Sequence, residues 1–303
     1  MKKGISIFFV FLFFPIMYGC ADDNSINDID IDANGVNIND NGFHYEAEIF
    51  AVIPNLGSYA GHSFQGFAVH GDIAFGFYDT GLCRCIDLNK KEIIAEFALP
   101  EGVRHNNNHA GVACFSNEFL SENDEFPLLY LSSYKERKCY VLNMTPTNAT
   151  LVQTIMTVDS LNDNKVQDVW AYEPDGEILL LKMTSKTEYN WVSVKRPSVI
   201  SGKEVYIDIN NSIDTFSVKS SATYNAGFAL NGRIYQLAGY TKPSRKLYIL
   251  DYVNKSIIAD ITWNSHIIND QEQEQCSKYK DGILINYNYS DKLVYVKFNN
   301  WSF

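Results

Sequence analysis

Apolar and aromatic residues alternate with polar residues along most of the chain beyond residue 43. The stretches 73–78, 138–143 and 282–287 are typical, and all three are rich in Phe, Tyr, Val, Ile and Leu. Alternation with a period of two predicts β-strands that bury one face, and Gly, Asn and Asp residues mark the turns between them. No comparable helical periodicity follows the first twenty residues. The sequence therefore predicts an all-β protein.

The chain also repeats itself. The segment Gly66–Ile73 (GFAVHGDI) returns as Gly227–Ile234 (GFALNGRI) 161 residues later, and five residues of Asp87–Ala95 return in Asp251–Ala259 after 164 residues. Repeats of a strand pattern are typical of radial β architectures, in which each unit stacks on its neighbours. We therefore expect a β-propeller. A β-sandwich with accidental repeats is the alternative.

The repeat columns define five units, which begin near residues 64, 111, 167, 226 and 276. The third unit is the least regular, and its outer strand lies somewhere within 204–219. The last unit has only three strands, but Ala47-Glu48-Ile49 matches the outer strands of other units. Residues 45–53 are therefore expected to complete the last blade, which closes the ring and removes the open sheet edges. The prediction is five four-stranded blades, with six blades as the alternative.

The residues before this domain are predicted to form a targeting segment followed by a linker. Lys2 and Lys3 precede an apolar stretch over 5–16 that is too short to span a bilayer and fits a signal peptide. Residues 21–43 contain six Asp and no Lys or Arg, a composition that predicts a flexible tether. The expected divisions are a signal peptide over 1–19, an acidic tether over 20–43 and a single propeller over 44–303.

The segment Met17-Tyr18-Gly19-Cys20 resembles the lipobox of bacterial lipoproteins. This resemblance implies lipidation of Cys20, palmitate included, and anchoring in the outer membrane. Asp22 and Asp23 resemble the acidic export signal of surface-exposed Bacteroidetes lipoproteins, which implies display on the cell surface.

Charge narrows the range of partners. The chain has 25 Lys and Arg against 36 Asp and Glu, a formal net charge of −11. An acidic chain without basic clusters argues against nucleic acid and against anionic membrane surfaces, so membrane attachment is expected through Cys20 alone. Cys83 and Cys139 share a repeat column with Leu247 and Leu293, which indicates that they are core residues.

Candidate ligand-binding residues follow from the repeat. In a propeller, the segments that lead into the inner strands gather around the central channel at one face, where the loops between second and third strands join them. Every unit places polar side chains there. The predicted ring consists of His62, Gln65, Asn106, His109, Gln167, Asp168, Tyr224, Asn225, Glu274 and Gln275.

A neutral, amide-rich ring suits carbohydrate hydroxyls better than anions. His62, His109 and Asp168 or Glu274 offer the ligands of a divalent metal as an alternative, although no cofactor is expected. His and Asn residues also cap turns and satisfy backbone groups, so a structural role competes with both readings.

The run Gln65–Ala68 with Gly71-Asp72-Ile73 and Asp87-Leu88 is similar to inner strands in propellers of phage receptor-binding and teichoic-acid-associated proteins. The similarity covers about one blade and implies a propeller with glycan contact, without any catalytic residue. Three functions stay open: a surface module that binds a glycan at the channel mouth, a glycoside hydrolase or metal-dependent lyase, and a docking platform for surface proteins.

Overall fold

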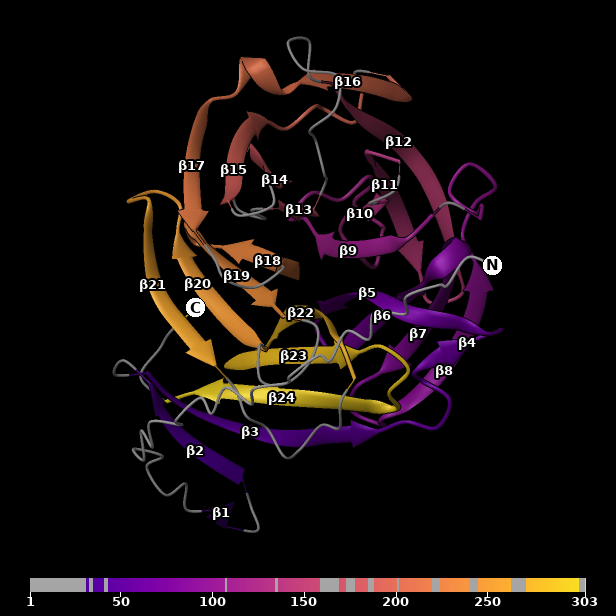
Figure 1. The fold of residues 1–303 in the computed structure, drawn as a ribbon. Coiled ribbons are helices and arrows are strands. Elements are labelled where there is room, and N and C mark those ends of the chain that lie inside the picture. Colours follow the sequence, from indigo (N-terminus) through magenta and orange to yellow (C-terminus); the bar gives the residue numbers. More distant parts are fainter. Residues whose placement is uncertain are drawn as a thin grey trace, which may run out of the picture.

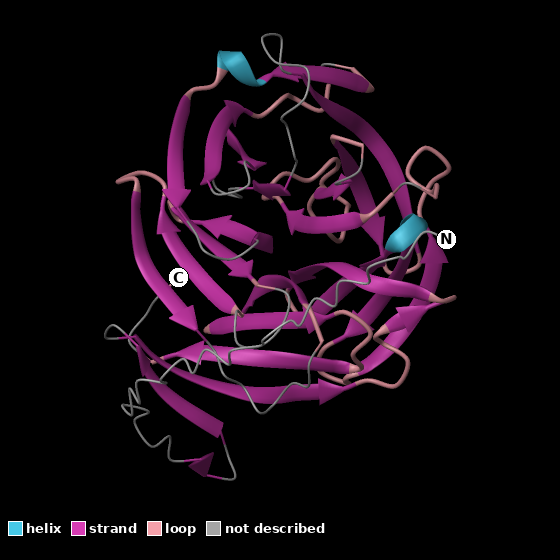
Figure 2. Ribbon diagram, viewed as in Figure 1, coloured by secondary structure: helices cyan, strands magenta, loops and turns pink. Residues whose placement is uncertain are grey.

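The structure is a computed structural model in which the strands form five sheets around a common centre, a propeller-like arrangement (Figure 1). Strand dominates, and the described helices are two short 3-10 turns, η1 (Asp79–Gly81) and η2 (Ile209–Asn211) (Figure 2). Among the residues that the structure describes, no helix is long and apolar enough to cross a membrane. The described residues are 31–32, 35–40, 43–106, 108–133, 136–158, 169–172, 178–184, 188–200, 202–219, 224–239, 245–262, 271–299 and 303.

Each sheet runs from an inner strand at the centre to an outer strand at the rim (Figure 1). The first contains β5 (His62–His70), β6 (Ile73–Tyr78), β7 (Leu82–Asp87) and β8 (Glu92–Ala98), with β4 (Ser58–Tyr59) beside β5. The second contains β9 (Ala110–Phe115), β10 (Leu129–Ser133), β11 (Lys138–Thr145), β12 (Asn148–Val158) and β16 (Glu204–Asp208). The third contains β13 (Val169–Tyr172), β14 (Ile178–Thr184), β15 (Glu188–Lys195) and β17 (Asp214–Lys219). The fourth contains β18 (Tyr224–Leu230), β19 (Arg233–Ala238), β20 (Lys246–Asp251) and β21 (Ser256–Thr262). The last contains β22 (Gln273–Tyr279), β23 (Gly282–Tyr287), β24 (Lys292–Phe298), β3 (Phe43–Val52), β2 (Gly35–Asp40) and β1 (Ile31–Asp32).

The N-terminal strand completes the last sheet. β3 pairs antiparallel with β24, from Val52 opposite Lys292 to Tyr45 opposite Phe298. The sequence predicts this pairing from the outer-strand match at residues 47–49, and it is confirmed. Because the two ends of the domain share one sheet, the ring closes without an additional connection.

Two differences from the expected strand assignment lie at the rim. β1 and β2 fall inside the predicted tether, where β2 pairs with β3, so residues 31–32 and 35–40 extend the last sheet outward instead of forming coil. The alternation in Gly35-Val36-Asn37-Ile38-Asn39 suits such an edge strand. β16 joins the second sheet in parallel with β12, which leaves β17 as the outer strand of the third. The predicted signal peptide and Cys20 lie outside the described residues.

A bulge recurs at the same point in three inner strands. The strand register shifts between Phe64 and Phe67 in β5, and at the equivalent points of β18 and β22. The bulged pairs are Gln65-Gly66, Asn225-Ala226 and Glu274-Gln275. Gly227 follows the second of them, and a Cβ there would lie 2.0 Å from the carbonyl oxygen of Tyr235. Because a bulge redirects side chains, the repeated sequence places polar residues toward the centre of the ring.

Apolar side chains fill the space between the sheets. Cys83 and Cys139 are fully buried, as the repeat column predicts. The five described cysteines are buried thiols outside disulfide bonds, and burial raises the pKa of the Cys85 thiol to about 12. These thiols therefore act as small core residues and not as nucleophiles.

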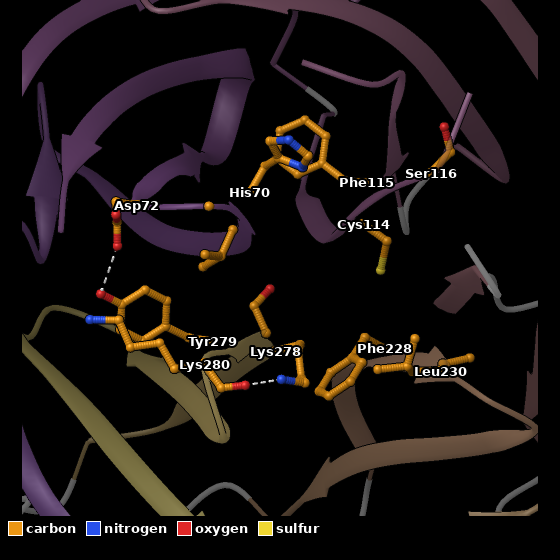
Figure 3. A pocket seen from close by; sticks show the side chains of 14 residues that line it. His70, Asp72, Cys114, Phe115, Ser116, Phe228, Leu230, Lys278, Tyr279 and Lys280 are labelled. Atoms are coloured by element: carbon orange, nitrogen blue, oxygen red, sulfur yellow. Dashed lines mark hydrogen bonds between the residues drawn. The ribbon is translucent and has the colours of Figure 1, made fainter. Parts of the chain in front are cut away.

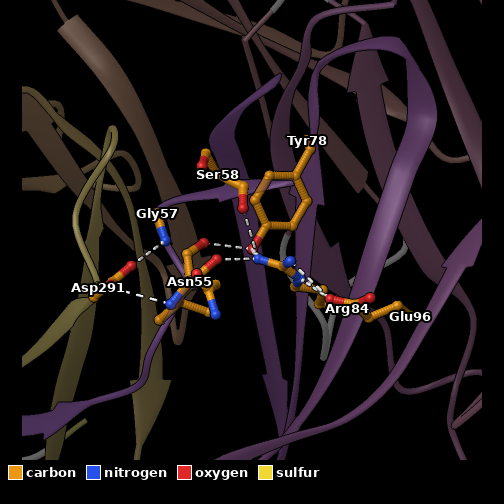
Figure 4. Close-up of polar contacts among 8 residues, drawn as sticks. Asn55, Gly57, Ser58, Tyr78, Arg84, Glu96 and Asp291 are labelled. Carbon is orange, nitrogen blue, oxygen red and sulfur yellow. Dashed lines mark hydrogen bonds and ion pairs between the residues drawn. The ribbon is translucent and has the colours of Figure 1, made fainter. Parts of the chain in front are cut away.

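The segment that leads from the last sheet to the first is held by Arg84 of β7 (Figure 4). The Arg84 guanidinium is almost fully buried and donates to the carbonyl oxygens of Asn55 and Ser58 and, at 2.7 Å, to Glu96. It also lies 4.6 Å from the ring centre of Tyr59. From the last sheet, the two carboxylate oxygens of Asp291 accept from the backbone N–H groups of Asn55 and Gly57. We call this set the closure clasp.

Candidate functional site

The bulges bring several predicted residues together where the inner strands begin, but their side chains have different roles. Gln275 is fully buried, and its Oε1 accepts from the backbone N–H groups of Phe67, at 2.9 Å, and Ala113, at 2.8 Å. Its Nε2 donates to the carbonyl oxygen of Ala113 at 2.5 Å. A single amide from β22 thus joins the inner strands of the first and second sheets. Gln275 therefore has a structural role in joining these strands, and its predicted contact with a ligand stays a prediction.

Asn225 follows the same structural pattern. Its Nδ2 donates to the carbonyl oxygen of Gln273, and its own carbonyl oxygen accepts from Nε2 of Gln236. The Gln273 amide in turn donates to the carbonyl oxygen of Ala238 at 2.6 Å. These contacts satisfy backbone groups that the bulges leave unpaired, which is the capping role that the sequence left open.

Four other residues form a connected polar group. Asp79 accepts from Nδ1 of His109 through Oδ1 at 2.6 Å and from Oγ of Ser63 through Oδ2 at 2.8 Å. Nε2 of Gln65 donates to the same Ser63 oxygen at 2.7 Å. About a third of the side chains of His109 and Asp79 remains exposed, at 31% and 28%. We call Ser63, Gln65, Asp79 and His109 the mouth cluster.

Local backbone contacts hold the two halves of the mouth cluster in register. Asp79 begins η1, the turn between the second and third strands, and the next residue, Thr80, donates its backbone N–H to the carbonyl oxygen of Asn108 at 2.8 Å. The Asn108 side chain donates to the carbonyl oxygen of Val103 and accepts from the backbone of Ala110. The loop before β9 therefore presents His109 to Asp79.

Two glutamates border the mouth cluster. Burial raises the pKa of Glu274 well above its usual range, assisted by repulsion from Glu272 and Asp79 and opposed by a hydrogen bond with Asn288. Burial also raises the pKa of Glu272, while the nearby His109 opposes the shift. Two carboxyl groups that favour protonation thus lie beside a carboxylate–imidazole pair.

The arrangement excludes one familiar chemistry. In a Ser-His-Asp triad the imidazole takes a proton from the serine hydroxyl. Here Ser63 and His109 bond separately to Asp79, so the described contacts do not have the order Ser-His-Asp. Within the described residues, no group of three His, Cys, Asp or Glu side chains could hold a metal ion.

The other predicted residues are less informative. His62 is half-buried at the start of β5, and Asn106 is exposed in the loop before β9. The backbone of Tyr224 pairs with Ala238, but its side chain is not described. Gln167 and Asp168 lie outside the described residues.

The sequence predicted Gln65, His109 and Glu274 at this face but missed Ser63, Asp79 and Glu272. Asp79 could have been predicted from the sequence. It lies in the loop between the second and third strands of the first sheet, and such loops join the same face of a propeller. Glu272 precedes the inner strand by one residue, outside the bulged pair that the repeat aligns.

We expect Glu274→Gln to raise stability at neutral pH. As the pH rises above about 4.3, the ordinary value for Glu, the unfolded chain loses this proton while the folded protein keeps it. The free energy of unfolding therefore falls as the pH rises toward the folded-state pKa. At pH 7.5 the variant should be more stable by about 1–2 kcal/mol, or roughly 3–6 °C in Tm. At pH 4 the two proteins should melt together.

Differential scanning calorimetry over this pH range measures the difference. The exposed Glu48, replaced by Gln, is the control and should show no pH-dependent gain. A Glu274→Gln protein that is less stable than the wild type at pH 7.5 would contradict the assignment of a protonated carboxyl.

Comparison with known proteins supports the fold. No family model matches the chain, and no curated protein matches it. Among solved structures, the chain is similar to Myxococcus xanthus glutaminyl cyclase, with 14% identity over 83% of this chain and 96% of that one and a TM-score of 0.52. It is also similar to the WD40 propeller of Doa1 (10% identity, 80% and 66% covered, TM-score 0.41) and to the propeller of Cps50 (Swd1) from Myceliophteria thermophila (12%, 80% and 84%, 0.40). The arrangement of its own sheets, together with the likeness to the first of these structures, shows an all-β protein with a propeller-like fold.

Proposed function

We propose that this protein is a surface-anchored lipoprotein that binds a neutral glycan at the mouth cluster. One observation carries the proposal: Asp79 and His109 are paired, partly exposed and supported from below by Ser63 and Gln65. Sugar hydroxyls both donate and accept, so they match a carboxylate beside an imidazole. The carboxylate of Asp79 makes the mouth less favourable for anionic polysaccharides than for neutral ones.

The anchor and the blade count belong to the same proposal. The signal peptide over 1–19 would direct export and be removed, and a lipid on Cys20 would then hold the propeller on the outer membrane, facing outward. Protease treatment of intact cells tests this, and survival of the protein would contradict surface display. We count the five sheets as five blades of one closed ring, with the N-terminal strand completing the fifth.

Binding is tested with a panel of neutral and acidic oligosaccharides measured by calorimetry. His109→Ala should weaken binding of the best neutral ligand at least tenfold, about 1.4 kcal/mol, because a hydrogen-bonding partner of the ligand is lost. His105→Ala is a matched control from the same loop, since His105 bonds to Glu136 at 2.8 Å. Equal loss in both variants, or no loss in His109→Ala, would contradict the site.

A second candidate is an enzyme that transfers protons at the same mouth. It is favoured by the raised pKa of both Glu272 and Glu274, since a raised pKa brings a carboxyl group closer to the range in which it can act as a general acid. A fold neighbour is a glutaminyl cyclase, so peptides with N-terminal glutamine join glycosides in the substrate panel. Repeating the assays with a chelator tests the metal-dependent lyase, because a chelator would remove the metal that its turnover requires. If the protein turns over one of these substrates and Glu272→Gln abolishes the turnover, the enzyme is favoured. If the protein binds a partner protein whether or not a glycan is present, the docking platform is favoured.

A further inference from the structure

A separate cavity lies at the opposite end of the central channel. Its volume is about 450 Å³, and it is formed where the inner strands end, whereas the mouth cluster lies where they begin. The walls come from four of the five sheets, through the ends of β5, β9, β18 and β22 (Figure 3). Its lining includes His70, Phe115, Phe228, Leu230, Lys278 and Lys280.

Aromatic rings form much of the wall. The His70 imidazole lies 5.6 Å from the Phe115 ring centre and 6.0 Å from that of Phe126. Burial lowers the pKa of His70, which keeps it neutral at pH 7. On the other side, Phe228 stacks on Tyr235 with 4.7 Å between ring centres. The cavity can therefore accept a flat apolar group between opposed faces.

The charged groups of the cavity lining are Lys278, Lys280 and Asp72. Lys278 points toward Phe228 and donates to the carbonyl oxygen of Lys280 (Figure 3). Its Nζ lies 4.6 Å from the ring centre of Phe303. The Lys278 side chain is half-buried, and among the described residues no carboxylate forms an ion pair with it.

Asp72 lines the cavity and Asp281 acts electrostatically on Lys278, but each of these acids already has another partner. Asp281 forms an ion pair with Lys297 at 2.9 Å, and Asp72 accepts from the Tyr279 hydroxyl at 3.2 Å. A cation without a carboxylate partner is notable in a chain of net charge −11. An anionic ligand would supply the negative charge that Lys278 lacks as a partner.

We propose that this cavity binds a small organic anion that carries an aromatic ring. The anionic group bonds to Nζ of Lys278, and the ring packs between Phe115 and Phe228. The volume suits a single small molecule and is within the range of ordinary ligand pockets, about 300–1,000 Å³. This site is independent of the glycan site that we propose at the mouth cluster.

Indole-3-acetate, indole-3-acetamide and tryptamine are matched probes that differ in charge. Calorimetry on the purified protein should show that the anion binds at least tenfold more tightly than the neutral amide and that the cation does not bind. Lys278→Met should remove the preference for the anion and leave the amide unchanged. Leu230→Trp should abolish binding of both by filling the cavity.

Lys292→Met, away from the cavity, is the control for loss of a positive charge, and His109→Ala separates the two ends of the channel. Both should bind indole-3-acetate as the wild type does. Equal affinity for acetate and amide in the wild type, an unchanged preference in Lys278→Met, or no binding of any probe would overturn the proposal. A loss in His109→Ala would also overturn it, since the anion would then occupy the other end.

Discussion

Replacing Gln275 with Leu should lower the free energy of unfolding by about 3–5 kcal/mol. Leu has a similar volume, so the change leaves little cavity, but it removes every hydrogen bond of the amide. Three buried backbone groups on Phe67 and Ala113 lose their partner. Each unsatisfied buried group costs about 1–3 kcal/mol, and the three costs overlap because the strands can relax.

Urea unfolding followed by tryptophan fluorescence measures this loss. Gln271→Leu is the matched control, because Gln271 makes one described side-chain contact at the surface, with the carbonyl oxygen of Tyr289. It should cost less than about 1 kcal/mol. If Gln275→Leu were as stable as the control, the inner strands would not depend on this amide, and the structural assignment of Gln275 would be wrong.

Replacing Arg84 with Met should cost about 2–4 kcal/mol. Met retains much of the apolar contact with Tyr59 and Tyr78, but the carbonyl oxygens of Asn55 and Ser58 lose their donor. The segment between the last and first sheets would then be held by Asp291 alone within the closure clasp. We therefore expect the loss to appear as earlier opening of this segment as well as lower global stability.

Two further variants separate charge from geometry in the closure clasp. Arg84→Lys keeps the positive charge, but an ammonium group lacks the planar fork of donors with which the guanidinium reaches several acceptors. It should therefore recover less than half of the stability lost in Arg84→Met. Glu96→Gln should cost less than about 1 kcal/mol, because the Glu96 side chain is 43% exposed. A large loss in Glu96→Gln with a small loss in Arg84→Met would show that the ion pair, and not the backbone contacts, stabilises the closure.

Much of the fold could be predicted because the repeat carries geometric information. Gly66 and Gly227 lie within one position of each other relative to the bulge of their inner strands, and the outer-strand match at residues 47–49 located the partner of β24. The rim was harder to predict. β16 and β2 are short strands at or next to a sheet edge. Their pairing depends on which sheet edge is open, and the sequence of a single strand does not specify that edge.

The candidate site could be predicted only in part. The repeat identified which polar residues approach the channel, but the partner of each side chain depends on neighbouring sheets. Gln65 and Gln275 occupy comparable bulges, yet one bonds to a side chain of the mouth cluster and the other joins two backbones. The cavity at the opposite end of the channel was not predicted. Its lining residues, among them Phe, Leu and Lys, are of the kinds found at the ends of many strands, so the sequence does not distinguish them.

The most direct test of the proposed function is a hydrogen-exchange footprint of the protein with the neutral oligosaccharide that binds best. We predict slower exchange in residues 76–82, 105–110 and 271–275, which surround Asp79, His109 and Glu272. The segments 114–116, 228–230 and 277–280 at the opposite end should exchange at unchanged rates. Protection confined to that opposite end, or no neutral oligosaccharide that alters exchange at the mouth cluster, would contradict glycan binding there.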